Sequence, residues 1–214
     1  MTALAATFNA ADVSAPGHYG PSQTALLLLD FHSIFVQKHG GSNAPAALEV
    51  ATKMRTWAKS QDIQVIHCLI DLNATPSPTC KDADRLAGTV TALKSSGGEE
   101  SIELIEGGGN DITFTRRPGC VSAMNSPGLD DHLQEKGIKS LVLTGLSTSG
   151  CVMRTALAAS DAEYVVTVIS DGCADRDQGL HQIILEKVLN NRGYVTTAAE
   201  IQEDFANFSN EKRD

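Results

Sequence analysis

The chain has 214 residues, a length typical of one domain with a sizeable buried core. Its formal net charge of -9 offers no basic surface for nucleic-acid phosphates, so we expect no nucleic-acid partner. No apolar run reaches the length of a membrane span and the N-terminus lacks a signal-peptide pattern, so we expect a cytoplasmic protein that does not contact a membrane.

The predicted elements alternate between strands and helices along the chain. Residues 1–22 show no periodicity and are expected to form an N-terminal arm, followed by a single domain over 23–214. Short apolar runs predict strands, and apolar residues at helical spacing predict helices. The expected strands are 24–30, 63–70, 111–116, 140–144, 164–170 and 194–197, and the expected helices are 45–60, 129–137, 151–162 and 178–190.

This alternation predicts an α/β fold of three layers, α/β/α, in which helices cover both faces of a six-stranded, mostly parallel sheet. The segment 71–110 is rich in glycine and proline and is expected to be a long irregular connection with one short helix at 83–93. Long connections of this kind often cover active sites.

Ligands of open parallel sheets bind beyond the carboxyl ends of the strands, and three places in the sequence meet that condition. Asp30 ends the first apolar run, the pair Arg116 and Arg117 ends the third, and Cys151 follows the fourth. A buried carboxylate such as Asp30 suits a general base, or alternatively a cap for loop amides.

Cys151 follows a glycine-bearing turn and is expected to begin a helix. The positive end of the helix dipole and nearby N–H groups would favour its thiolate, and the same N–H groups could hold an oxyanion. The alternative is a small buried cysteine that only packs. The five cysteines have no C-x-x-C spacing, which argues against a disulfide framework and a zinc knuckle.

Four motifs together resemble the isochorismatase-like cysteine hydrolases, a family that includes nicotinamidases, carbamoylsarcosine amidohydrolases and maleamate amidohydrolases. The resemblance covers roughly residues 24–200. Its motifs are Leu-Leu-Leu-Asp30-Phe-His-Ser-Ile-Phe35, Ser122-Ala-Met, Gly145-Leu-Ser-Thr-Ser-Gly-Cys151-Val, and Ser170-Asp-Gly-Cys-Ala-Asp-Arg176 followed by His181.

The resemblance implies that Asp30 is the general base and Cys151 the nucleophile, with amides near Gly150 and Cys151 as the oxyanion hole. The third catalytic residue of the family is a lysine, which is replaced here by Arg116 or Arg117. The distance from Asp111 favours the first arginine, and the proline that follows favours the second. An arginine keeps the positive charge but cannot exchange a proton near neutral pH. It could instead bind a carboxylate in a bidentate fork and select an acidic substrate.

The resemblance also implies a cis peptide between Leu146 and Ser147. His32 and Phe35 follow the base closely, and each is equally expected to line the substrate pocket or to pack in the interior. No histidine follows Asp71, so the metal site of the nicotinamidases is not implied. His67 is expected to be a packed core histidine rather than a ligand. Asp175, Arg176 and His181 are expected to cap loops and helices, with a subunit contact as the alternative.

The leading hypothesis is hydrolysis of a small amide or ureido C–N bond through a cysteine thioester, on a small-molecule substrate and without a cofactor. One alternative is hydrolysis of an isochorismate-type vinyl ether, which generally uses the aspartate without the cysteine. A second is a catalytically impaired relative that acts as a binding protein, because the lysine is missing. The resemblance further implies a homo-oligomer, either a dimer or a tetramer.

Overall fold

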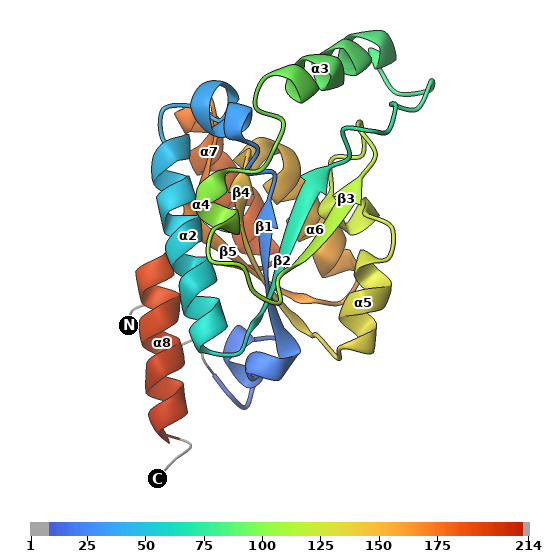
Figure 1. Ribbon diagram of the computed structural model, residues 1–214. Coiled ribbons are helices and arrows are strands. Elements are labelled where there is room, and N and C mark those ends of the chain that lie inside the picture. The colour runs from blue at the N-terminus through green and yellow to red at the C-terminus, as the bar shows by residue number, and fades with distance from the viewer. Residues whose placement is uncertain (1–8, 212–214) are drawn as a thin grey trace.

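The computed structural model describes residues 9–211 and shows a single six-stranded sheet with helices on both faces (Figure 1). All the strand pairs are parallel, in the order β3-β2-β1-β4-β5-β6. The predicted α/β/α fold class is therefore confirmed. The strands are β1 (Thr24–Leu29), β2 (Gln64–Ile70), β3 (Ile112–Arg116), β4 (Ser140–Leu146), β5 (Val165–Ala174) and β6 (Tyr194–Thr196).

Alternate residues of β1 point to opposite faces of the sheet, and every one of them is buried. Leu27 and Leu29 belong to the core beneath α5 (Leu129–Glu135), α6 (Met153–Asp161) and the segment after α7 (Gln178–Ile183). Leu26 and Leu28 belong to the opposite core, beneath α2 (Ala44–Ser60) and α8 (Ala198–Glu211). Helix α8 was not predicted, and the predicted helix 178–190 is interrupted by η6 (Ile184–Val188) and η7 (Leu189–Asn191).

The order of the strands places a topological switch point between β1 and β4, because the chain builds outward from β1 to β3 and then crosses to β4. These two strands approach each other closely at their carboxyl ends. A Cβ added at Gly145 would lie 2.5 Å from the Cβ of Leu29, so only glycine fits there. The turns after β1 and β4, which carry Asp30 and Cys151, are brought together as a result.

The connection 71–110 contains α3 (Ala83–Ser95) and α4 (Ile102–Ile105), and α3 stands beyond the carboxyl ends of β2 and β3 (Figure 1). Between these helices, residues 97–101 run antiparallel to residues 31–34; we call residues 97–101 the strap. Its hydrogen bonds include Ser33 N–H to the Glu99 carbonyl and Ser101 N–H to the Phe31 carbonyl, both at 2.9 Å. The strap thus holds the turn that follows the candidate base.

Residues 1–8 of the expected N-terminal arm lie outside the described residues, as do residues 212–214. The described part of the arm contains the short turns η1 (Pro16–His18) and η2 (Pro21–Gln23), and η1 contacts β5. The domain boundary, the cytoplasmic location and the homo-oligomer stay predictions. Over residues 9–211, no helix is long and apolar enough to cross a membrane.

Candidate active site

Asp30 begins the turn after β1 in a left-handed conformation, with φ of 55°, and its side chain is buried. Aspartate and asparagine tolerate this conformation better than most other residues with a Cβ. Arg116, the last residue of β3, donates from both terminal nitrogens to the two carboxylate oxygens, with 3.0 Å between Nη1 and Oδ1. The structure therefore places a bidentate ion pair at the end of the central strands.

The same guanidinium also reaches the cysteine. Its Nη2 lies 3.4 Å from Cys151 Sγ, while its Nε donates to the Cys120 carbonyl at 2.8 Å. Although burial opposes the charge, Asp30 and Cys151 raise the pKa of Arg116, so it remains cationic. Of the two candidate arginines, Arg116 is thus the one beside Asp30 and Cys151.

Arg117 is exposed, and its side chain points away from Asp30 and Cys151. Its Nε donates to the Thr75 carbonyl at 2.6 Å and its Nη2 to the Pro76 carbonyl at 3.1 Å. Successive residues at the end of a strand point in opposite directions, so only one of two adjacent arginines can face the crevice. Arg117 therefore ties down the first part of the connection 71–110 and does not join the cluster.

Cys151 lies in the turn η5 (Thr148–Val152), and α6 begins only at Met153. Gly150 is the one residue of η5 with a non-helical conformation, so Cys151 begins the helical stretch that continues into α6, as the sequence predicted. The predicted cis peptide between Leu146 and Ser147 is confirmed. Of the two amides expected near the oxyanion, the Gly150 N–H donates to the Ser147 carbonyl at 3.0 Å.

The thiol of Cys151 is buried, and burial raises its pKa well above the ordinary value of 9.0. The charge of Asp30 and a hydrogen bond to it act in the same direction, whereas Arg116 and the Thr155 hydroxyl, 3.6 Å from Sγ, act against it. Burial and Asp30 thus oppose the thiolate that the helix dipole would favour. Asp30, hydrogen-bonded to the thiol, is placed to accept its proton.

A cavity of about 220 Å³ opens onto this cluster. Phe35, Leu146, Ser147 and Gly150, four of the five residues expected to bind the substrate, line it, and their role in binding stays a prediction. Three further lining residues, His39, Gly40 and Val121, were missed. The helical spacing of Phe35 and His39 was a usable signal, since a residue four positions along a helical turn faces the same side. Their rings are 6.3 Å apart, edge to face.

His32 does not line the cavity, because its ring is buried beneath the strap. Its Nδ1 lies 2.5 Å from the Gly98 carbonyl, and its Nε2 accepts the Ile70 N–H at 3.2 Å. The Nε2 atom is also 3.9 Å from Asp30 Oδ1. Of the two equal expectations for His32, packing describes its position, and the ring joins the strap and β2 to the turn of Asp30.

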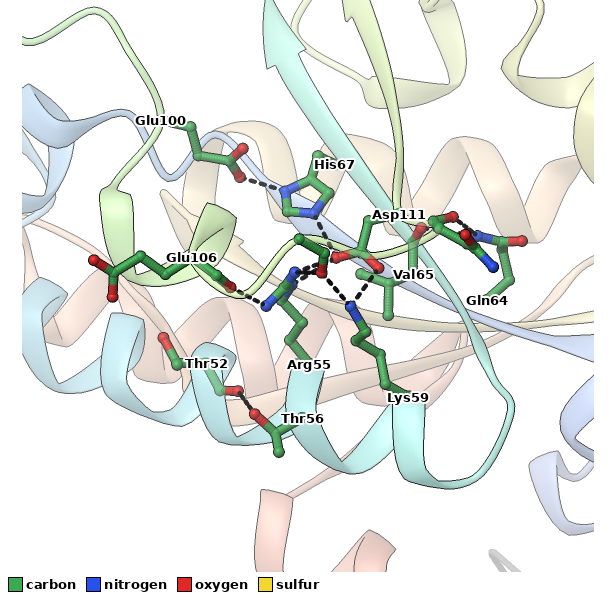
Figure 2. Close-up of polar contacts among 12 residues, drawn as sticks. Thr52, Arg55, Thr56, Lys59, Gln64, Val65, His67, Glu100, Glu106 and Asp111 are labelled. Carbon is green, nitrogen blue, oxygen red and sulfur yellow. Dashed lines mark hydrogen bonds and ion pairs between the residues drawn. The ribbon is translucent and has the colours of Figure 1, made fainter.

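A network of buried polar groups supports the strap from the other side (Figure 2). Glu100, on the strap, lies 2.7 Å from Nδ1 of His67, whose Nε2 faces Asp111 at 3.5 Å. Arg55 and Lys59 of α2 converge on Asp111 at 2.6 and 3.3 Å. Burial would raise the pKa of Asp111, but hydrogen bonds and charges from these two cations lower it below 3.8. The core histidine predicted at position 67 is thus part of an ionic network.

The turn that carries Cys151 is anchored by residues after β5. Asp175 accepts the Ser149 N–H at 2.7 Å, and Nδ1 of His181 lies 2.8 Å from the Thr148 hydroxyl. Burial favours the neutral carboxyl of Asp175, yet hydrogen bonds from Ser149 and neighbouring amides lower its pKa below 3.8. Capping, the favoured expectation, describes Asp175, whereas His181 contacts a side-chain hydroxyl. Over the described residues, no group of three or more His, Cys, Asp or Glu side chains is placed to hold a metal ion.

Comparisons with known proteins point to one family. The model of the isochorismatase domain matches residues 24–200. The isochorismatase domain-containing protein 2 of Xenopus laevis is 32% identical over 77 residues, which are 36% of this chain and 38% of that protein. The match thus spans well under half of the curated relative.

Solved structures share the fold at low sequence identity. A cysteine hydrolase from Pseudomonas syringae has a TM-score of 0.78 at 18% identity, covering 89% of this chain and 95% of that one. An N-carbamoylsarcosine amidase from Thermoplasma acidophilum has a TM-score of 0.67 at 21% identity, covering 82% of this chain and 96% of that one.

Proposed function

Because this chain belongs to the isochorismatase family of hydrolases, we propose that it cleaves a small amide or ureido C–N bond through a thioester on Cys151. The observation that carries the proposal is the contact of one buried guanidinium with both the Asp30 carboxylate and the Cys151 sulfur. This cluster offers a nucleophile and a base that line one cavity, with a fixed positive charge buried behind them. The names of two fold relatives, a cysteine hydrolase and an N-carbamoylsarcosine amidase, agree with that chemistry.

The first half of the reaction forms the thioester. Asp30 accepts the thiol proton as the Cys151 sulfur attacks the carbonyl carbon, and the oxyanion that develops is held by backbone N–H groups. The Gly150 amide already donates to Ser147, so we assign most of this role to the Cys151 amide. The C–N bond then breaks, and the amine leaves with the proton that Asp30 returns.

The second half releases the acid product. Water attacks the thioester carbonyl while Asp30 takes its proton, the C–S bond breaks, and the sulfur regains a proton. Arg116 exchanges no proton in either half, because the pKa of a guanidinium lies far above neutral pH. Its role is to orient the Asp30 carboxylate and to stabilise negative charge on a sulfur 3.4 Å away.

A panel of amides and ureides, together with isochorismate, tests the proposal when the parent chain is compared with Cys151→Ala. We expect ammonia or amine release by the parent and a loss of at least about a thousandfold in kcat for the variant, as is typical when a covalent nucleophile is removed. Cys173→Ala is the matched control, because Cys173 is also buried but does not line the cavity.

The outcomes separate the alternatives. Isochorismate cleavage that survives in Cys151→Ala would support the vinyl ether hydrolase in place of the amidase. Tight binding of panel members without any turnover would support the binding protein. Full amide turnover by Cys151→Ala would refute the thioester route.

A further inference from the structure

The arginine beside Cys151 directs all three of its nitrogens at groups of the protein itself, and it does not line the cavity. Its two terminal nitrogens bind the Asp30 carboxylate, one of them also approaches the sulfur, and its Nε binds the Cys120 carbonyl. The side chain is 1% exposed. The bidentate fork that could have selected an acidic substrate therefore already holds a carboxylate of the protein itself.

Among the residues that the structure describes, none that lines the cavity carries a fixed positive charge. Phe35, Val121 and Leu146 are apolar, and Ser147 and the Gly40 and Gly150 backbone are polar but neutral. Asp30 is matched by Arg116, so the floor carries no net charge. His39, exposed at the cavity, is the one other lining residue of the described chain, apart from Asp30 and Cys151, with an ionisable side chain.

We propose that this cavity selects small neutral substrates and excludes carboxylates, with His39 at the position that sets the charge preference; this rests on the proposed function. A carboxylate placed here would lose its hydration and face the Asp30 oxygens without a free cation. The net charge of -9 also disfavours the approach of anions. A planar neutral amide needs only hydrogen bonds and an aromatic face, which Phe35 provides.

Two alkylating reagents of nearly equal shape test the charge preference directly. Iodoacetamide is neutral and iodoacetate is anionic, and each alkylates a thiol by forming an S–C bond as iodide leaves and the thiol proton passes to a base. Peptide-level mass spectrometry gives the rate at each cysteine of the native chain. Cys80 and Cys120 are partly exposed and serve as internal standards.

We expect the ratio of the iodoacetamide rate to the iodoacetate rate to be at least about tenfold larger at Cys151 than at the two standards, because an unpaired carboxylate is costly to desolvate. An equal or smaller ratio at Cys151 would overturn the proposal. Failure of both reagents to label Cys151 would overturn it as well, since a cavity that admits no small neutral electrophile cannot select neutral substrates.

A pair of variants tests the position of His39. His39→Lys introduces a fixed cation, so the ratio at Cys151 should fall by about tenfold toward that of the standards, whereas the neutral His39→Gln should leave it within about twofold. If the ratio of the two rates at Cys151 changes equally in both variants, the charge at position 39 does not set the preference. These results can be told apart from a failure of the proposed function. If Cys151→Ala retains turnover, the thioester route fails, but the cavity can still prefer neutral molecules. If a thioester forms on an anionic substrate, the thioester route stands and the charge preference fails.

Discussion

At the scale of single residues, the chemistry depends on which side chain occupies the end of β3. The sequence motifs indicated Asp30 and Cys151. They did not decide whether Arg116 or Arg117 stands beside them, because the sequence does not show which of two adjacent arginines points into the site. The strand's twist and pairing decide the matter, since Arg116 pairs in register with Ile70 and turns inward. His39 was missed because it acts through a cavity wall built from four separate segments.

Asp30→Asn should abolish turnover while preserving the shape of the turn, because asparagine also tolerates a positive φ. We expect kcat to fall by a factor of about a thousand or more, because the base is lost. The free energy of unfolding should fall by about 3 kcal/mol, since Arg116 becomes an unpaired buried charge. Steady-state kinetics and urea unfolding measure both effects.

Asp111→Asn is the matched control, because Asp111 also pairs with a buried arginine, Arg55, but lies away from the cavity. It should lower the stability but lower kcat by no more than about tenfold, because Asp111 supports the strap through His67 and does not reach the reacting atoms. Equal losses of kcat in the two variants would show that Asp30 acts only through stability.

At the scale of elements, the sequence predicted the central elements well, because β1 is apolar throughout and α2 repeats apolar residues at helical spacing. Predictions failed where tertiary contacts decide the conformation. The predicted helix 178–190 is interrupted by η6 and η7, and α8 becomes stable by packing Ile201 and Phe205 against α2 and the sheet. The strap was not predicted, because its backbone pairing with residues 31–34 has no local signature.

Glu100 should affect catalysis through the strap, as a positioning residue. In Glu100→Ala the contact with His67 is lost, so the turn of Asp30 is held less firmly, and we expect kcat to fall by about tenfold with a smaller change in KM. Glu100→Gln keeps an acceptor for the imidazole N–H and should restore most of the rate. If the two variants have the same kcat, the side-chain contact does not position the base.

At the scale of the whole molecule, the buried thiols predict loss of stability in alkali. Burial raises the pKa of Cys173 to about 12 and raises those of Cys68 and Cys151 further above 9.0. These thiols stay protonated in the folded chain while they ionise in the unfolded chain above pH 9. Their stabilising contribution is therefore complete below pH 9 and declines as the pH rises.

Urea unfolding at pH 8 and pH 10, with reductant present, measures this effect. We expect the free energy of unfolding to fall by about 1 kcal/mol for each of the three buried thiols, from 1.36 kcal/mol per pKa unit. Cys173→Ala should show about one third less dependence on pH than the parent. An unfolding free energy that is constant from pH 8 to pH 10 would contradict the burial of these thiols.

The most direct measurement is the mass of the enzyme quenched in acid during turnover of a neutral amide or ureide from the panel. A thioester intermediate predicts an added mass equal to the acyl group of the substrate, located by fragmentation on the peptide that carries Cys151. The adduct should be absent from Cys151→Ala and should disappear from the parent as substrate is exhausted. Rapid turnover without any adduct on Cys151, together with full turnover by Cys151→Ala, would contradict the account.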